Sequence, residues 1–259
     1  MGAKGGLLEG RRGLVIGVAN KRSIAWGIAQ KAAEAGAQLC LTYQNERLGE
    51  NVQELAVELK NPLLLPMDVG SDSQIVMAFE EIRRKWGKLD FVVHAVAYAP
   101  RQALEGRFVE TSREDFRVAH DISAYSLAAV SHAAQSLMPE GGSIVTVSYL
   151  GSTRVVPGYN VMGVAKASLE ASVRYLAADL GPQGIRVNAI SAGPIKTLAA
   201  SAIPGLGSKL KHHRAHTPLQ KDTDQLEVGD AGVFLLSDMG RGVTGQVLYV
   251  DGGFSIMAG

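Results

Sequence analysis

A tyrosine and a lysine are spaced so that a helix would bring them to one face. Tyr159 precedes Lys166 by seven positions, in a segment whose pattern predicts a helix over residues 159–180. Seven steps of about 100° end roughly 20° short of two turns, so the side chains would lie about 10 Å apart along the axis. A lysine held there can bind a nicotinamide ribose, and its charge would favour negative charge on the substrate partner of the phenol. A chance pairing of the two residues remains the alternative.

The turn after the first predicted strand could hold phosphate groups. Residues 17–25 read GVANKRSIA and follow the apolar run 14–16. Gly17 lets the chain turn tightly at the end of a strand, and small residues let a pyrophosphate reach free backbone N–H groups where a helix begins. The spacing is not G-x-G-x-x-G, because Ser23 and Ala25 stand where glycines are expected. An ordinary strand–helix connection therefore remains open.

Polar residues after the second and third predicted strands suit the adenosine half of a dinucleotide. Gln44 stands where dinucleotide-binding folds usually carry an acidic residue for the ribose. An amide offers a 2′-phosphate no compensating charge, which favours NADH, although Arg47 keeps NADPH open. Asp68 and Val69 would supply a carboxylate and an apolar wall for adenine. A helix cap is the alternative reading of Asp68.

Short apolar runs alternate with longer helical patterns along the whole chain. The predicted strands are 14–16, 39–43, 63–65, 91–93, 143–148, 186–190 and 247–250. The predicted helices are 24–35, 48–60, 73–86, 115–137 and 159–180. This alternation predicts an α/β fold, a Rossmann-like doubly wound parallel sheet of about seven strands with helices on both faces. Residues 1–259 are expected to form a single dinucleotide-binding and catalytic domain, with a substrate-binding lid at about 194–225.

Composition excludes several other classes of protein. The 26 Lys and Arg against 25 Asp and Glu give a net charge of +1, without the basic excess of a nucleic-acid-binding protein. The single cysteine, Cys40, forms neither an internal disulfide nor a cysteine-based metal site. No apolar run reaches the roughly 18 residues of a membrane-spanning helix, and the N-terminus does not read as a signal peptide. We therefore expect a protein of the reducing cytoplasm, without a membrane or nucleic-acid partner.

Several further runs carry a family resemblance when they are taken together. They are SIA at 23–25, TYQ at 42–44, SYLG at 148–151, YNVMG at 159–163, AKASLE at 165–170, RVNAISAGP at 186–194 and DGGF at 251–254. Together they resemble the short-chain dehydrogenase/reductase superfamily and, within it, the bacterial NADH-dependent enoyl-acyl-carrier-protein reductases. The matching runs span almost the whole chain.

The resemblance implies a reaction and assigns residues to it. The reaction is NADH-dependent reduction of the trans-2 double bond of an enoyl thioester, the final step of the fatty-acid elongation cycle. Tyr159 would donate a hydrogen bond to the developing enolate oxygen, Lys166 would hold the nicotinamide ribose, and Tyr149 would position the thioester. The expected cofactor-binding residues are Gly17, Ser23, Ile24, Gln44, Asp68, Val69, Val96, Lys166, Ile195, Lys196, Thr197, Leu198 and Ala199. The expected substrate-binding residues are Ala99, Tyr149, Tyr159, Leu198, Ala199, Ile203 and Leu206.

The position of the tyrosine weighs against a second activity of the same fold. Ordinary carbonyl reductases of the superfamily use Tyr-x-x-x-Lys, and the position four residues before Lys166 is Met162. In enoyl reduction the hydride goes to the β carbon and charge gathers on the thioester oxygen, two carbons further along. The phenol therefore has to be displaced relative to the nicotinamide. A ketoacyl or alcohol dehydrogenase remains one alternative, and a non-catalytic dinucleotide-sensing protein remains another.

Two regions raise separate questions. His94 opens the run HAVAYAP, which departs from the Ser-Ile-Gly-Phe-Ala-Pro of the family, and we expect a packed residue rather than a ligand or base. The lid carries Lys209, Lys211, His212, His213, Arg214 and His216. No carboxylate is close to the histidines in sequence, so no metal site is predicted. Lys209, Lys211 and Arg214 could instead meet an acidic acyl carrier protein. The resemblance also implies a homotetramer, for which the apolar segment 254–259 would suit an interface.

Overall fold

Seven parallel strands form one sheet in the order β3-β2-β1-β4-β5-β6-β7. A computed structural model describes residues 5–197, 200 and 205–257 of the chain. The strands are β1 (Arg12–Ile16), β2 (Gln38–Tyr43), β3 (Leu63–Pro66), β4 (Phe91–His94), β5 (Gly142–Ser148), β6 (Ile185–Ala192) and β7 (Val247–Val250). The strand order reverses between β1 and β4. Open α/β sheets bind ligands at such a switch point, outside the carboxyl ends of the strands.

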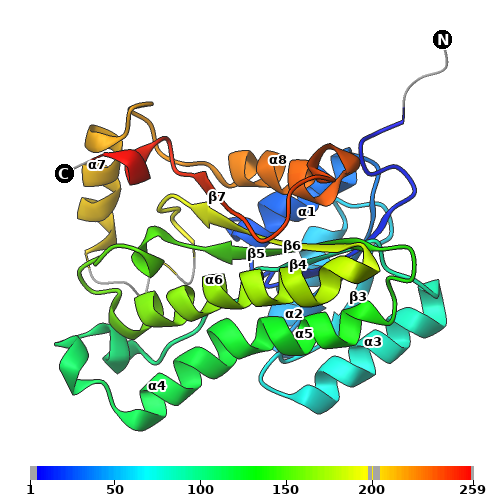
Figure 1. The fold of residues 1–259 in the computed structure, drawn as a ribbon, viewed down its shortest axis with the longest axis horizontal. Helices are drawn as coiled ribbons and strands as arrows, with labels where there is room; N and C mark the ends of the chain where they lie inside the picture. Colours follow the sequence, from blue (N-terminus) through cyan, green and yellow to red (C-terminus); the bar gives the residue numbers. More distant parts are fainter. Residues whose placement is uncertain (1–4, 198–199, 201–204, 258–259) are drawn as a thin grey trace.

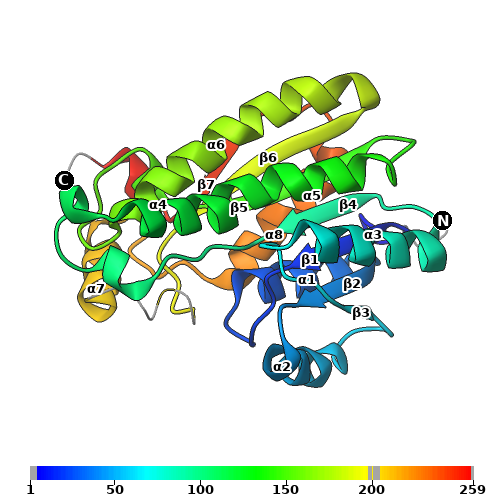
Figure 2. The same cartoon turned by 90° about the horizontal axis from the view of Figure 1, so that it is seen from below.

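Helices cover both faces of this sheet (Figure 1). They are α1 (Ile24–Glu34), α2 (Glu46–Ala56), α3 (Asp72–Trp86), α4 (Arg113–His120), α5 (Ser126–Gln135), α6 (Asn160–Leu180), α7 (Leu206–His216) and α8 (Gln225–Leu236). Helices α1, α2 and α8 pack on one face, while α3, α5 and α6 pack on the other, where Figure 2 shows α5 alongside α6. Side chains of β1 alternate between the two cores, with Leu14 and Ile16 in one and Val15 in the other. The predicted doubly wound α/β fold is confirmed.

Helix α8 is an element that the sequence analysis did not name. Asp224 accepts a hydrogen bond from the backbone N–H of Leu226, and Glu227 completes a capping box at the helix N-terminus. A Cβ on Gly229 would lie 2.5 Å from the carbonyl oxygen of Gly27 in α1, so glycine is needed for the close approach of the two helices. The helix is apolar on most of its surface. Its sequence therefore lacks the contrast between one apolar and one polar face by which an amphipathic helix is predicted.

A π-helical turn interrupts the long helix predicted over 115–137. Asp121–Tyr125 forms this turn between α4 and α5. The hydroxyl of Ser123 accepts a hydrogen bond from the Tyr98 N–H at 2.9 Å and donates one to the Tyr98 carbonyl at 3.0 Å. The turn thereby fixes the chain that follows β4. Local turns of this kind depend on tertiary contacts, which the helical periodicity of the sequence does not carry.

His94 is packed inside the protein, as the sequence predicted. Its side chain is fully buried, with Nδ1 at 2.9 Å from Thr146 Oγ1 and Nε2 at 2.8 Å from Ser126 Oγ. Burial, together with the nearby Lys166 ammonium, lowers the pKa of His94 to about 3. The ring is therefore neutral at physiological pH. It joins the ends of β4 and β5 to α5.

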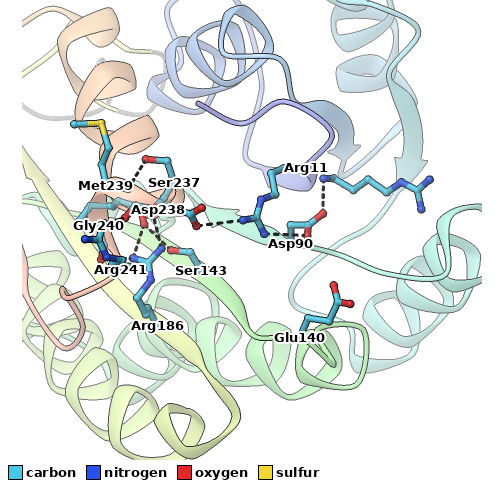
Figure 3. Close-up of polar contacts among 12 residues, drawn as sticks. Arg11, Asp90, Glu140, Ser143, Arg186, Ser237, Asp238, Met239, Gly240 and Arg241 are labelled. Carbon is cyan, nitrogen blue, oxygen red and sulfur yellow. Dashed lines mark hydrogen bonds and ion pairs between the residues drawn. The ribbon is translucent and has the colours of Figure 1, made fainter. Parts of the chain in front are cut away.

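A network of charged groups lies at the amino ends of the strands, opposite the end of the sheet near His94 (Figure 3). Arg186, in β6, donates hydrogen bonds to the carbonyl of Leu235 in the last turn of α8 and to those of Ser237 and Gly240 just past it. Arg11 bridges Asp90 and Asp238 in the same region. These contacts fasten the C-terminal end of α8 to the sheet. Across the described residues, no helix combines the length and apolarity needed to cross a membrane.

Candidate active site

A cavity of about 450 Å³ opens at the carboxyl ends of β1, β4, β5 and β6. Its lining includes the predicted residues Gly17, Ser23, Ile24, Val96, Ala99, Tyr149, Tyr159, Lys166, Ile195 and Thr197. Leu104 and Val156, to which the sequence analysis assigned no role, also line it, as does Lys209, which was expected to meet a carrier protein. Leu104 and Met162 form a small apolar cluster with Tyr159. Leu104 lies in the short η1 helix (Arg101–Leu104), and no motif in the sequence points to its role.

The two predicted tyrosines lie against each other on one side of this cavity. Their ring centroids are 4.9 Å apart and the rings meet edge to face at 68°. Tyr159 directly precedes α6, while Tyr149 follows β5. A Cβ on Gly151 would lie 2.4 Å from the Tyr159 ring, so this glycine allows the segment carrying Tyr149 to come close. Burial raises the pKa of both phenols, which stay protonated at neutral pH and able to donate a hydrogen bond.

Lys166 is buried beside the tyrosines with its charge turned to the end of β5. Its side chain is only 4% exposed, and Nζ donates a hydrogen bond to the Val147 carbonyl at 2.7 Å. Burial lowers the pKa of Lys166 to about 8, against an opposing effect of Glu170 on the same helix. Tyr159 and Lys166 both line the cavity. The helix predicted to carry both begins one residue later than expected, and Asn160 has φ +39°, so ideal helical spacing does not by itself place the phenol. A cation in this position can bind hydroxyl groups of a bound sugar.

Hydrogen bonds to the Ser23 side chain fix the shape of the predicted phosphate-binding turn. Ser23 Oγ accepts hydrogen bonds from the N–H groups of Ala19 and Asn20, each at 3.0 Å. A serine hydroxyl that accepts two such bonds still has its own proton to donate to an anion. Gly17 has φ +103°, and a Cβ there would lie 2.1 Å from the Ala95 carbonyl oxygen. The turn leads into α1, whose first N–H groups can bind an anion.

The structure joins two residues predicted to bind the adenosine half. Gln44 Nε2 donates a hydrogen bond to Asp68 Oδ2 at 2.9 Å, across the ends of β2 and β3. Asp68 Oδ1 accepts from the Gly70 N–H at 2.9 Å. The N-cap of α3 is Ser71, so the alternative reading of Asp68 as a helix cap is wrong. Val69, next to Asp68, is buried in the core on the α3 side of the sheet, and its role as a wall for adenine stays a prediction.

The segment after β6 is described only in part. Ile195 and Thr197 line the cavity, whereas Lys196 between them is exposed and does not belong to the lining. The predicted residues Leu198, Ala199 and Ile203 lie outside the described residues. Leu206 is placed at the start of α7, without a described side chain. Their roles stay predictions.

The lid contains α7, at one end of the molecule beside the C-terminal η8 turn (Phe254–Ile256) (Figure 1). Its three predicted docking cations differ in their surroundings. Lys209 Nζ donates to the Pro157 carbonyl at 2.5 Å and lines the cavity, whereas Arg214 forms an ion pair with Asp222. Of the three, only Lys211 is exposed and forms neither an ion pair nor a side-chain hydrogen bond among the described residues. Within the same part of the chain, no three His, Cys, Asp or Glu side chains are placed to share a metal ion.

Comparisons with known proteins agree with this geometry. The chain is 55% identical to the enoyl-[acyl-carrier-protein] reductase [NADH] FabI of Nostoc sp., over 96% of this chain and 98% of that protein. A crystal structure of the Bacillus cereus enoyl-acyl carrier protein reductase with NADP+ and indole naphthyridinone has a TM-score of 0.96 at 53% identity, covering 98% and 99% of the two chains. The Anaplasma phagocytophilum reductase in complex with NAD has a TM-score of 0.95 at 47% identity, covering 99% and 98%. A sequence profile described as enoyl-(acyl carrier protein) reductase matches residues 17–255. The chain therefore belongs to the enoyl-acyl-carrier-protein reductase family.

Proposed function

We propose that this cavity binds NADH and the enoyl thioester of an acyl carrier protein, and that the chain reduces the trans-2 double bond to the saturated thioester. The observation that carries this proposal is the half-buried Tyr149 packed on the buried Tyr159, with Lys166 lining the same cavity, in a chain of this family. The residues present fit the dinucleotide. The Ser23 turn offers hydrogen-bond donors for a pyrophosphate, and Lys166 offers a cation for a ribose.

The protein contributes binding, orientation and electrostatic stabilisation to this reaction. NADH, when bound, supplies a hydride for the β carbon of the substrate. A proton, drawn ultimately from solvent, then adds to the α carbon and completes the saturated thioester. Tyr159 donates a hydrogen bond to the thioester oxygen, on which negative charge develops as the double bond is reduced. Its raised pKa keeps the proton on the phenol, so it acts as a donor and not as a base. Tyr149, packed on the Tyr159 ring, orients the thioester.

Lys166 and the apolar wall define where the reacting groups lie. The ammonium of Lys166 binds ribose hydroxyls and fixes the position of the nicotinamide end of the cofactor. Leu104, Val156 and Met162 surround the Tyr159 side of the cavity and exclude water from the thioester oxygen. A hydrogen bond to that oxygen is stronger in a site without water.

Oxidation of NADH on addition of crotonyl-coenzyme A tests this function. We expect loss of the NADH absorbance with the enoyl thioester and none with a β-ketoacyl thioester under the same conditions. Turnover with the ketone alone would establish the carbonyl-reductase alternative. An absence of turnover with both substrates, in protein that binds NADH, would establish a dinucleotide sensor.

Docking of the acyl carrier protein to α7 forms a second part of the proposal. Lys211 is an exposed cation on this helix, near the cavity that Lys209 lines. Lys211→Glu should raise KM for enoyl-acyl-carrier-protein about 3- to 10-fold and leave KM for crotonyl-coenzyme A unchanged. Lys60→Glu, an exposed reversal between α2 and β3, is the matched control and should leave both unchanged. Equal effects of Lys211→Glu on the two substrates would contradict docking at α7.

A homotetramer in the cytoplasm is the proposed working form of the enzyme. Apolar and aromatic side chains are exposed along α4, the π-helical turn and α6, namely Phe116, Tyr125, Val164 and Tyr175. Such a row suits contacts between copies of one chain. Sedimentation equilibrium should give a mass near four times 27.4 kDa. A monomeric mass at micromolar concentration would contradict the assembly.

A further inference from the structure

A buried carboxylate outside the residues assigned above bonds the segment that carries Tyr149. Glu170, on α6, is 6% exposed, and its Oε1 accepts hydrogen bonds from Ser148 Oγ at 2.5 Å and from Ser152 Oγ at 2.6 Å. Distances of about 2.5–2.7 Å are typical of a hydroxyl bonded to a charged oxygen. Two hydroxyl donors on one oxygen also require that this oxygen carry no proton.

The two serines stand on either side of the tyrosine. Ser148 ends β5, and Ser152 ends the short η4 helix (Leu150–Ser152), so the bonds to Glu170 close a loop around Tyr149. The same loop touches α6 at a second point, where a Cβ on Gly163 would lie 2.8 Å from the Gly151 carbonyl oxygen. The position of the Tyr149 ring against Tyr159 is therefore set by contacts of its neighbours with α6.

The carboxylate also lies one helical turn from Lys166. Residues four apart on a helix share a face, and the Glu170 charge favours the charged form of the buried ammonium. The other titratable groups facing Lys166 are neutral. They are the imidazole of His94 on β4 and the phenols of Tyr149 and Tyr159. Arg174 Nη1 contacts only the backbone carbonyl of Glu170, at 3.1 Å.

We propose that Glu170 is a positioning residue of this active site. Its bonds to Ser148 and Ser152 hold Tyr149 in place, and its negative charge stabilises the Lys166 ammonium. Glu170 touches neither substrate nor cofactor and acts through these neighbours. The proposal rests on the roles given to Tyr149, Tyr159 and Lys166 in the proposed function.

Two substitutions of Glu170 test the contributions of its charge and of its side-chain length separately. Glu170→Gln keeps the shape and removes the charge. It should lower kcat on crotonyl-coenzyme A about 10-fold and move the alkaline limb of the kcat/KM profile about half a pH unit lower. Glu170→Asp keeps the charge and withdraws the oxygens by one methylene. It should lower kcat about 10-fold with the alkaline limb at the wild-type pH.

Ser152→Ala is the milder matched variant, because it removes one bond to Glu170 and leaves the charge and Ser148 in place. It should lower kcat about threefold without moving the alkaline limb. Thermal unfolding followed by circular dichroism shows which variants are folded. If Glu170→Gln does not fold, the proposal is tested by Glu170→Asp and Ser152→Ala. A wild-type kcat in both of these variants overturns it.

The results also separate this inference from the proposed function. Wild-type kcat or a wild-type alkaline limb in folded Glu170→Gln overturns the role of Glu170, provided that Tyr159→Phe loses turnover. Wild-type turnover in Tyr159→Phe overturns the proposed function instead, whatever Glu170→Gln does. Lowered kcat with a displaced limb in Glu170→Gln, and an unmoved limb in Glu170→Asp, supports the inference.

Discussion

Tyr159→Phe should lower kcat on crotonyl-coenzyme A by about 10²- to 10³-fold, the usual cost of removing one hydrogen-bond donor to a developing oxyanion. The phenol is buried, and its raised pKa keeps the proton available for the thioester oxygen. Phenylalanine preserves the ring that packs on Tyr149, Leu104 and Met162. The loss is therefore confined to the hydroxyl. The Kd for NADH, measured by fluorescence titration, should change by less than about twofold.

Tyr249→Phe is the matched control for this substitution. Tyr249 lies on β7, is 37% exposed and does not line the cavity. Its kcat and its Kd for NADH should equal those of the wild type. Near wild-type turnover in Tyr159→Phe would contradict the proposed role of the phenol. A large rise in the Kd for NADH without loss of kcat would instead assign Tyr159 to cofactor binding.

Lys166→Met should raise the Kd for NADH about 10- to 100-fold, because a charged hydrogen-bond donor to the ribose is lost. Methionine fills most of the volume of the buried lysine stem, so packing of α6 against β5 is largely retained. Lys60→Met, at an exposed position, is the control and should bind NADH as the wild type does. An unchanged Kd in folded Lys166→Met would contradict the role of the ammonium.

The binding of NADH should also depend on pH through Lys166. Burial lowers the pKa of this amine from 10.5 to about 8, so the charged form predominates below pH 8 and the neutral form above it. Affinity for NADH should therefore fall as pH rises through about 8. In Lys166→Met the affinity should not change over the same range. A wild-type affinity that is constant between pH 7 and 9 would show that the charge is not used.

Much of the fold was predictable from the order of residue types along the chain. Apolar runs alternating with helical patterns indicated the parallel sheet, since buried strands read as continuous apolar segments. The misses have physical causes. Helix α8 packs against α1 through Gly27 and Gly229 and is apolar on most sides, so its sequence lacks an amphipathic period. The π-helical turn at Asp121–Tyr125 depends on the contact of Ser123 with Tyr98, far along the chain.

Some features of the active site were likewise predictable from the sequence, and others were not. The seven-residue spacing of Tyr159 and Lys166 predicted that the two side chains face one site, and both line the cavity. The position of Tyr159 also depends on the turn before α6, because the helix begins at Asn160, which has φ +39°. The surroundings of the lid cations were not predictable. Arg214 finds Asp222 and Lys209 reaches Pro157 only when α7 is folded into place.

The sequence by itself determined the sheet and predicted the phosphate-binding turn and the residues that can do chemistry, since residue type and local periodicity are local properties of the chain. Only the tertiary structure decided how those residues are charged and held. Burial lowers the pKa of Lys166. Hydrogen bonds join Glu170 to Ser148 and Ser152, which are about 20 positions away in the sequence. Desolvation and hydrogen bonding across the core arise from packing, and packing has no local signature.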